Sequence, residues 1–281
     1  MKKFLLFVLL FSSLGNFAQR NDHKQFISHD VGVFIGGSYY IGDLNPRRHF
    51  FQTQPAGGVF YRYNYNYRLA FRGGFNIGSV VGDDSQSSDD DQLERNLNFK
   101  SKVQEFHALA EFNFVEYSIG HNKFIFSPYV FLGISVFHFD PMANMGNQWV
   151  DLRRMSTEGQ KTSQNPGQKQ YKLIQPSIPF GFGFKLDLAK NVGLGFEWGP
   201  RKTFTDYLDD VSGKYVNPLK LAAEKGVTAG ILSDRSLKAD GTSNIGKQRG
   251  NPYTKDWYFF YGFTINFKLK QKPAECRGVG H

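Results

Sequence analysis

Two histidines lie near carboxylates at spacings that could support acid–base chemistry. His107 precedes Glu111 by four residues, and His138 precedes Asp140 by two. Either pair would share one face of a β-strand, because every second residue points to the same side. Neighbouring residues on one face are about 7 Å apart. A hydrolase also needs a nucleophile within hydrogen-bond reach of its base, and no serine accompanies either pair in the sequence. We therefore interpret both histidines as structural, and we predict no catalytic residue.

The densest charge is an acidic run, DDSQSSDDD, at residues 83–91. Carboxylate oxygens at such spacing could hold Ca²⁺. The EF-hand loop, however, needs a central glycine and a terminal bidentate glutamate, and this run has neither. The run therefore predicts a solvated, mobile loop, with no metal and no other cofactor.

The N-terminus predicts export. Lys2 and Lys3 precede a short apolar run over residues 4–11, and Ala18 supplies a small residue at the expected cleavage position. This is the arrangement of a secretory signal peptide. The chain has a single cysteine, Cys276, which excludes an internal disulfide framework and a thiolate metal cluster. The net charge of +9 is spread along the chain with no dense basic block, so a nucleic-acid partner is not expected.

The composition favours a β protein. Aromatic residues make up 16% of the chain and there are 30 glycines, yet the mean hydropathy is −0.43. Aromatic residues and glycine are weak helix formers, and an aromatic-rich chain is not typical of disorder. No run approaches the roughly 20 apolar residues that a membrane-spanning helix needs. The apolar residues must instead be diluted by alternation.

Eight segments alternate between apolar and small or polar residues with a period of two. The last is the clearest, because Trp257, Phe259, Phe263 and Phe267 share one face while Thr264 lies on the other. Such alternation predicts half-buried strands. The predicted strands lie near 30–42, 54–64, 67–79, 102–115, 124–139, 172–188, 191–204 and 256–270.

The two faces of these strands indicate a membrane barrel. One face is rich in large apolar residues, and the other mixes glycine, serine and charges of both signs, as in strands that are apolar outside and polar inside. An eight-stranded barrel is just wide enough for side chains to fill. We predict an all-β fold, an eight-stranded antiparallel transmembrane β-barrel with a packed polar interior. The predicted inward charges are Arg62, Arg68, Arg72, Glu111, Lys185, Asp187, Glu197 and Arg201.

The connections between the predicted strands alternate in length, which predicts how the barrel is oriented. Short turns and long loops follow one another strictly, as in outer-membrane barrels with short periplasmic turns and long outer loops. We predict a signal peptide at 1–18, an outer-membrane barrel at 19–270 and a short periplasmic tail at 271–281.

The segment at residues 199–215, GPRKTFTDYLDDVSGKY, enters the longest loop. Arg201 and Lys202 could pair with its aspartates, and its tyrosines could anchor the loop on the barrel rim. We predict a folded segment with a structural or partner-binding role. Its candidate residues are Arg201, Lys202, Thr203, Asp206, Tyr207, Asp209, Asp210 and Tyr215.

This segment, together with SYYIGDLN at residues 38–45, resembles the PorG family, outer-membrane barrels of the type IX secretion and gliding motility machinery. The resemblance implies a non-enzymatic subunit that ties the periplasmic ring of PorK and PorN to the outer membrane. The residues alone leave two alternatives open. These are a general barrel, adhesin or structural, and a lipid-modifying outer-membrane enzyme.

The C-terminal exit from the last strand is basic. Lys268, Lys270, Lys272 and Arg277 follow one another closely. Such a patch could steer an acidic partner or contact the headgroups of outer-membrane lipid. We expect the tail to be one of the periplasmic surfaces available to the ring proteins.

Overall fold

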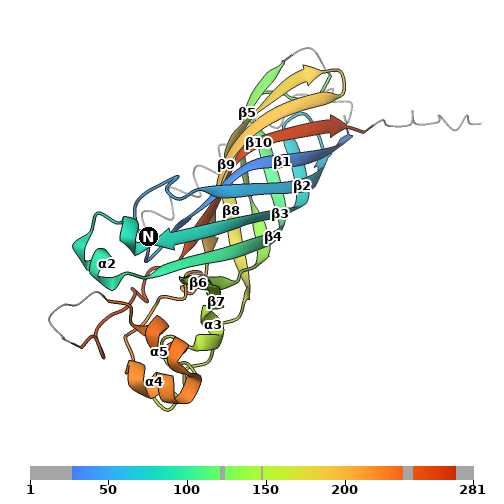
Figure 1. Cartoon of the computed structure of the whole chain (residues 1–281). Coiled ribbons are helices and arrows are strands. Elements are labelled where there is room, and N and C mark those ends of the chain that lie inside the picture. Colours follow the sequence, from blue (N-terminus) through green and yellow to red (C-terminus); the bar gives the residue numbers. More distant parts are fainter. Residues whose placement is uncertain (1–26, 121–123, 147, 237–242, 270–281) are drawn as a thin grey trace, which may run out of the picture.

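The computed structural model describes residues 27–120, 124–146, 148–236 and 243–269, and its main body is a barrel (Figure 1). Eight strands close in the order β1-β2-β3-β4-β5-β8-β9-β10, each antiparallel to its neighbours, and β10 pairs with β1. The predicted fold class is therefore confirmed. The barrel strands are β1 (Ser28–Ile41), β2 (Gln54–Asn64), β3 (Leu69–Asp83), β4 (Asn98–Asn113), β5 (Phe126–His138), β8 (Ile174–Ala189), β9 (Val192–Thr203) and β10 (Trp257–Lys268).

The first and last strands meet along a seam of twelve residue pairs, from Asp30 opposite Lys268 to Ile41 opposite Trp257. At the middle of the seam the backbones approach closely. A Cβ atom on Gly36 would lie 2.0 Å from the carbonyl oxygen of Tyr261. Glycine is required there because no other residue leaves room for that oxygen.

The outer wall is apolar, as the alternation predicts. Ile134 on β5 is 72% exposed and Phe106 on β4 is 68% exposed, and both lie in the middle of their strands. A monomer in water rarely exposes so large an apolar belt, whereas a lipid bilayer solvates it. Other exposed apolar residues of this wall are Ile35, Val59, Phe71, Phe112, Leu132, Val136, Phe180, Phe182, Phe184, Phe263 and Phe267.

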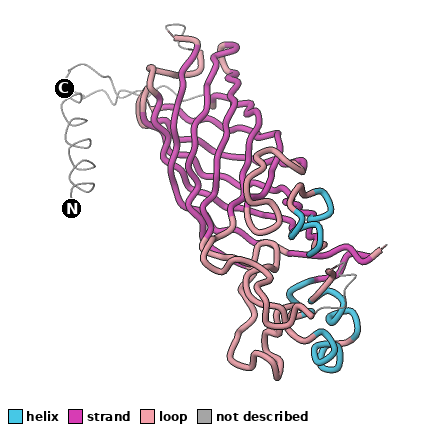
Figure 2. Tube along the Cα trace, turned by 90° about the vertical axis from the view of Figure 1, so that its left-hand side faces the viewer, coloured by secondary structure: helices cyan, strands magenta, loops and turns pink. Residues whose placement is uncertain are grey.

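The two ends of the barrel differ in the length of their connections. The turn end carries the short connections after β2, β4 and β8, and the loop end carries the long ones after β1, β3, β5 and β9. Figure 2 shows the helices gathered at the loop end. Among the described residues, no helix is both long and apolar enough to cross a membrane.

The long connections contain structure that the alternation did not predict. Short elements fill them, because loops of this length fold only by burying side chains of their own. We call the described residues within 84–97, 139–173 and 204–256 the cap. Its elements are η2 (Asp84–Gln86), α2 (Asp90–Arg95), β6 (Pro141–Met145), β7 (Gln148–Asp151), α3 (Leu152–Met155), α4 (Pro218–Lys225) and α5 (Val227–Ser233).

The acidic run at 83–91 is not a mobile loop, which corrects the sequence-based prediction. It forms η2 and the start of α2, with Asp83 and Asp89 as their N-caps. Asp84 is fully buried, and Arg95 Nε lies 2.7 Å from its carboxylate. A buried carboxylate needs such a partner, and the partner lies just beyond the run.

The apolar core continues from the barrel into the cap. Phe99, Phe137 and Tyr258 come from barrel strands, and Leu152 and Leu208 come from the cap, yet all belong to one buried cluster. Burying each such side chain stabilises the fold by about 1.5–3 kcal/mol. The cap is therefore a continuation of the barrel interior.

Candidate functional site

An ion-pair network centred on Glu111 fills the half of the barrel interior that is nearer the turn end. Arg62 Nε, Arg72 Nε and Lys185 Nζ lie 2.9, 3.0 and 2.6 Å from its two carboxylate oxygens. Arg72 also reaches Glu197, with Nη1 2.6 Å from Oε2. We call these five residues the Glu111 plug. All five are buried, so the predicted polar filling is present in the structure.

Two predicted inward charges lie elsewhere. Arg68 is exposed in the turn before β3, where its Nη1 donates to the carbonyl oxygen of Phe114 at 2.8 Å. Asp187 is half-buried at the turn end and accepts from the Gly120 N–H at 2.9 Å. Both stabilise turns and take no part in the plug.

Closer to the loop end than the plug, Glu105 contacts a second group of buried polar residues. Arg201 Nε lies 3.0 Å from Glu105 Oε2, and the Tyr258 hydroxyl donates to the same oxygen at 2.8 Å. The predicted pairing of Arg201 with aspartates of its own segment is therefore wrong. Arg201 lies on the inward face of β9, and Lys202 faces outward and is exposed. Sequence reasoning missed Glu105, because its partner lies 96 residues away.

His107 also belongs to this group. Its Nδ1 lies 3.2 Å from Glu105, and the expected neighbour Glu111 is held by the plug. Ser135 lies opposite His107 in the β4–β5 register, but its hydroxyl bonds to that of Ser177 at 2.6 Å. In the part of the chain that the structure describes, no serine hydroxyl is hydrogen-bonded to His107, and the histidine is buried. Within the described residues, His107 therefore forms no nucleophile–base pair with a serine.

The second histidine pair lies at the loop end. His138 is the last residue of β5, and Asp140 follows it between β5 and β6. The Asp140 N–H donates to the Ser101 hydroxyl at 2.9 Å. This contact ties the strand end to β4, which is consistent with a structural role.

The two motifs that carry the family resemblance meet in space. Tyr40, near the end of β1, donates a short hydrogen bond to Asp209 and a longer one, 3.3 Å, to Asp256. Asp256 in turn accepts from the Leu208 N–H at 2.9 Å, and its carbonyl accepts from the Thr203 hydroxyl at 2.6 Å. The segment after β9 is thereby fixed to the ends of β1 and β10.

The rest of that segment is packed against the cap. Asp210 accepts hydrogen bonds from the Tyr171 hydroxyl, at 2.7 Å, and from the Thr157 hydroxyl. Tyr207 stacks on Tyr171 with ring centroids 4.8 Å apart. Tyr215 is buried, and its N–H donates to the Lys247 carbonyl at 3.0 Å. The segment therefore has one folded conformation, held by contacts that the sequence did not identify.

Burial controls the charge of the aspartates in this region. It raises the pKa of Asp210 to about 7, although the neighbouring Arg249 opposes the shift. Burial likewise raises the pKa of Asp206 to about 7. Burial, together with the negative charge of Asp43, raises the pKa of Asp209 well above its usual value. The segment therefore carries less negative charge when folded than its composition implies.

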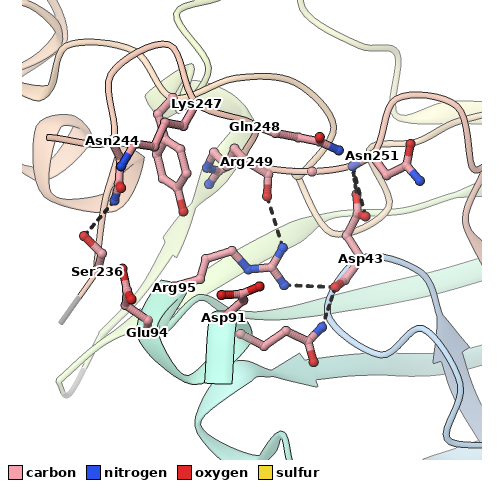
Figure 3. Close-up of a pocket in the computed structure, with 13 residues that line it drawn as sticks. Asp43, Asp91, Glu94, Arg95, Ser236, Asn244, Lys247, Gln248, Arg249 and Asn251 are labelled. Carbon is pink, nitrogen blue, oxygen red and sulfur yellow. Dashed lines mark hydrogen bonds between the residues drawn. The ribbon is translucent and has the colours of Figure 1, made fainter. Parts of the chain in front are cut away.

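A cleft of about 340 Å³ opens between α2, the end of β1 and the last part of the cap (Figure 3). Arg95 lies in it and donates to the carbonyl oxygens of Asp43 and Arg249, at 2.9 and 3.1 Å. The Asp43 carboxylate accepts from the Asn251 N–H at 3.1 Å. These polar groups satisfy one another, so the cleft is a joint between cap segments. Within the described residues, no group of three or more potential metal ligands converges.

The predicted basic exit is described only in part. Lys268 Nζ donates to the Ile119 carbonyl oxygen at 2.8 Å, which ties β10 to the turn after β4. Lys268 is thus engaged in a turn contact. Lys270, Lys272 and Arg277 lie outside the described residues, as do the predicted signal peptide and the tail at 271–281.

Comparisons with known proteins give a family and several similar structures. The family described as a domain of unknown function, DUF6089, matches residues 2–221. No curated protein matches the chain. Ail of Yersinia pestis, solved with a heparin analogue, is 9% identical, covers 86% of this chain and 99% of its own, with a TM-score of 0.40.

Two further solved structures are similar at the same level. Neisserial surface protein A is 9% identical over 86% of this chain and 97% of its own, with a TM-score of 0.40. OprG of Pseudomonas aeruginosa is 10% identical over 86% of this chain and 94% of its own, with a TM-score of 0.31. The fold assignment itself rests on the strand pairing described above.

Proposed function

The chain belongs to the DUF6089 family, and we propose that it is a non-enzymatic outer-membrane barrel subunit of the type IX protein secretion system. In this role it anchors a periplasmic ring of PorK- and PorN-like proteins to the outer membrane. The proposal combines the apolar belt, which suits an outer membrane, with the resemblance of residues 38–45 and 199–215 to the PorG family.

The observation that carries the proposal is the Glu111 plug. Five buried, mutually paired side chains occupy the interior where a channel would run. Removing Glu111 would leave Lys185 buried without its carboxylate partner, which is strongly unfavourable. A barrel filled in this way acts through its surfaces, as an anchor does.

The spatial contact between the two motifs gives further support. Tyr40 belongs to the shorter motif and Asp209 to the longer, and the hydrogen bond between them joins both to the barrel rim. Two motifs that resemble the same family thus form one structural unit. The unit fixes the cap and leaves the turn end free to contact a ring.

The turn end offers an apolar surface for such a contact. Ile125 is 62% exposed and Leu188 is 63% exposed, and the Asp187 N–H donates to the Ile125 carbonyl at 2.6 Å, which places the two segments side by side. Exposed apolar residues in neighbouring segments are typical of protein contact surfaces. We assign this pair to the ring interface.

Affinity purification of the full-length protein from native membranes tests the proposal. Ring proteins should co-purify with the unchanged chain and be lost from the Ile125→Asp/Leu188→Asp double variant. The matched control is Leu219→Asp, an exposed leucine on α4 at the opposite end, which should retain them. Absence of ring proteins from the unchanged chain would contradict the anchor role and favour an adhesin.

A further inference from the structure

Residues 46–53, which we call the wall finger, fold back along the outer wall of the barrel. The His49 ring packs edge-to-face on Phe259 of β10, with centroids 5.4 Å apart. Phe50 packs on Tyr39 of β1 and Tyr261 of β10, each at 5.0 Å. These partners point outward from their strands. Phe259 is consequently only 4% exposed, which corrects its assignment to the lipid-facing residues.

The wall finger has a defined and costly backbone conformation. Phe50 and Gln52 have φ angles of 61° and 51°, in the left-handed region that aromatic and long side chains rarely adopt. Each such residue costs about 1–3 kcal/mol and persists only where its surroundings enforce it. Tyr39 supplies part of that constraint, because its hydroxyl is bonded to His49 Nδ1 at 3.1 Å and to Trp198 Nε1 at 2.9 Å.

The wall finger lies at the edge of the apolar belt. Tyr39 is the third residue from the loop end of β1, and Ile35, four residues earlier, is 63% exposed on the same face. Four residues of strand span about 13 Å. Phe50 remains 51% exposed at this level, which we infer to be the boundary between acyl chains and headgroups.

Cationic side chains lie in the wall finger and on the strand beside it. Arg47 and Arg48 precede it and are exposed, and Lys202 faces outward on β9 opposite Trp257, two residues from Phe259. Among the described residues, none of these three cations forms an ion pair with a carboxylate within 4.0 Å.

Acidic residues lie near the two arginines of the wall finger. Asp83 and Asp89 line a pocket together with Arg47 and Arg48. Arg48 stacks on the Phe51 ring, 3.4 Å from its centroid, and its Nη1 donates to the Gln86 carbonyl oxygen at 2.9 Å. Arg48 is therefore partly engaged, whereas Arg47 and Lys202 are exposed and make no ion pair with any described residue.

We propose that the wall finger and Lys202 form a headgroup site for a phosphorylated lipid of the outer leaflet. Arg47 and Lys202 bind the phosphate, Arg48 supports the same anion, and Phe50 lies among the first acyl carbons. Arginine matches phosphate through paired N–H donors, and each basic residue at an anionic membrane surface strengthens binding by about 1 kcal/mol. The site rests on the proposed outer-membrane location and is independent of ring binding.

Full-length protein in phosphatidylcholine nanodiscs doped with bis-phosphorylated lipid A tests the site. Native mass spectrometry should show retained lipid A on the unchanged chain, and retention should fall about tenfold or more in Arg47→Gln/Lys202→Gln. The control Lys220→Gln/Lys225→Gln removes the same charge from exposed positions on α4 and should retain lipid A fully. Heat-modifiable migration on gels checks that each variant is folded.

Two further arms identify the source of the phosphate. Dephosphorylated lipid A should be retained no better than phosphatidylcholine, and inorganic phosphate should not displace lipid A at matched concentration. Equal retention by both double variants, or equal retention of the dephosphorylated lipid, would overturn the site. Displacement by inorganic phosphate would overturn the assignment to a lipid and leave a solute anion site.

Discussion

Arg201 Nε lies 3.0 Å from Glu105 Oε2 inside the barrel and joins β9 to β4, two strands that are not neighbours in the sheet. Replacing Arg201 by methionine leaves Glu105 buried without its principal cation. We expect Arg201→Met to lower the free energy of unfolding by about 3–5 kcal/mol, measured by urea titration of the detergent-solubilised protein.

Two variants make this expectation specific. Lys202→Met changes the next residue, which faces outward, and should alter stability by less than about 0.5 kcal/mol. The double variant Glu105→Gln/Arg201→Met removes both charges and should be more stable than the single changes predict when added. Strict additivity would show that the two groups do not interact.

The apolar belt predicts that the free-energy cost of an outward-facing arginine depends on its depth in the bilayer. Ile134 lies near the middle of β5, and Ile174 begins β8 at the loop end, yet both are exposed on the outer wall. Ile134→Arg should cost about 2–4 kcal/mol in lipid, and Ile174→Arg about 0–1 kcal/mol. Reversible unfolding in vesicles measures both, and equal costs would contradict the proposed position of the bilayer.

The cap should lose stability as pH rises. The pKa of Asp210 is about 7 in the folded chain, and an unfolded aspartate titrates near 4. Between these values the folded chain binds the extra proton, so stability falls with increasing pH by up to about 1.4 kcal/mol per unit. Hydrogen exchange over residues 204–216, corrected for intrinsic rates, should show this trend.

The control for this pH effect is Asp210→Asn, which has no proton to lose. In this variant the stability of the cap should fall less steeply with pH across the same range. The dependence should not vanish, because the pKa of Asp206 is also about 7. A cap that becomes more protected as pH rises would show that Asp210 is charged when folded.

Cysteine labelling can determine which end of the barrel faces the outside of the cell. Leu219 on α4 is 82% exposed in the cap, and Tyr65 is 42% exposed in the turn after β2. In a Cys276→Ser background, Leu219→Cys should react with an impermeant maleimide on intact cells, and Tyr65→Cys only after lysis. The reverse pattern would invert the proposed topology.

The barrel strands could be predicted because alternation is local. Each of the eight expected segments overlaps an observed strand, and Phe263 and Phe267 are exposed on the wall as expected. The pattern reports which face a residue occupies but not which residue lies opposite. For that reason the inward position of Arg201 was predictable, and its partner Glu105 was not.

The cap could not be predicted in the same way. Its helices α3 to α5 have eight residues or fewer, too few to establish a helical period. Their stability comes from contacts such as Asp210 with Tyr171, whose positions differ by 39 residues. Phe259 shows the same limit, because alternation placed it on the outer wall but could not reveal that His49 covers it.

The seam between β1 and β10 also orders events in time. Tyr40 and Asp256 are 216 positions apart and are brought together only when the first and last strands pair. Until then Asp209 lacks its hydrogen-bond partner on the rim, the Tyr40 hydroxyl. Complete folding of the segment after β9 therefore requires a finished barrel, and we expect a surface protease to cleave residues 204–216 more readily before the seam has closed.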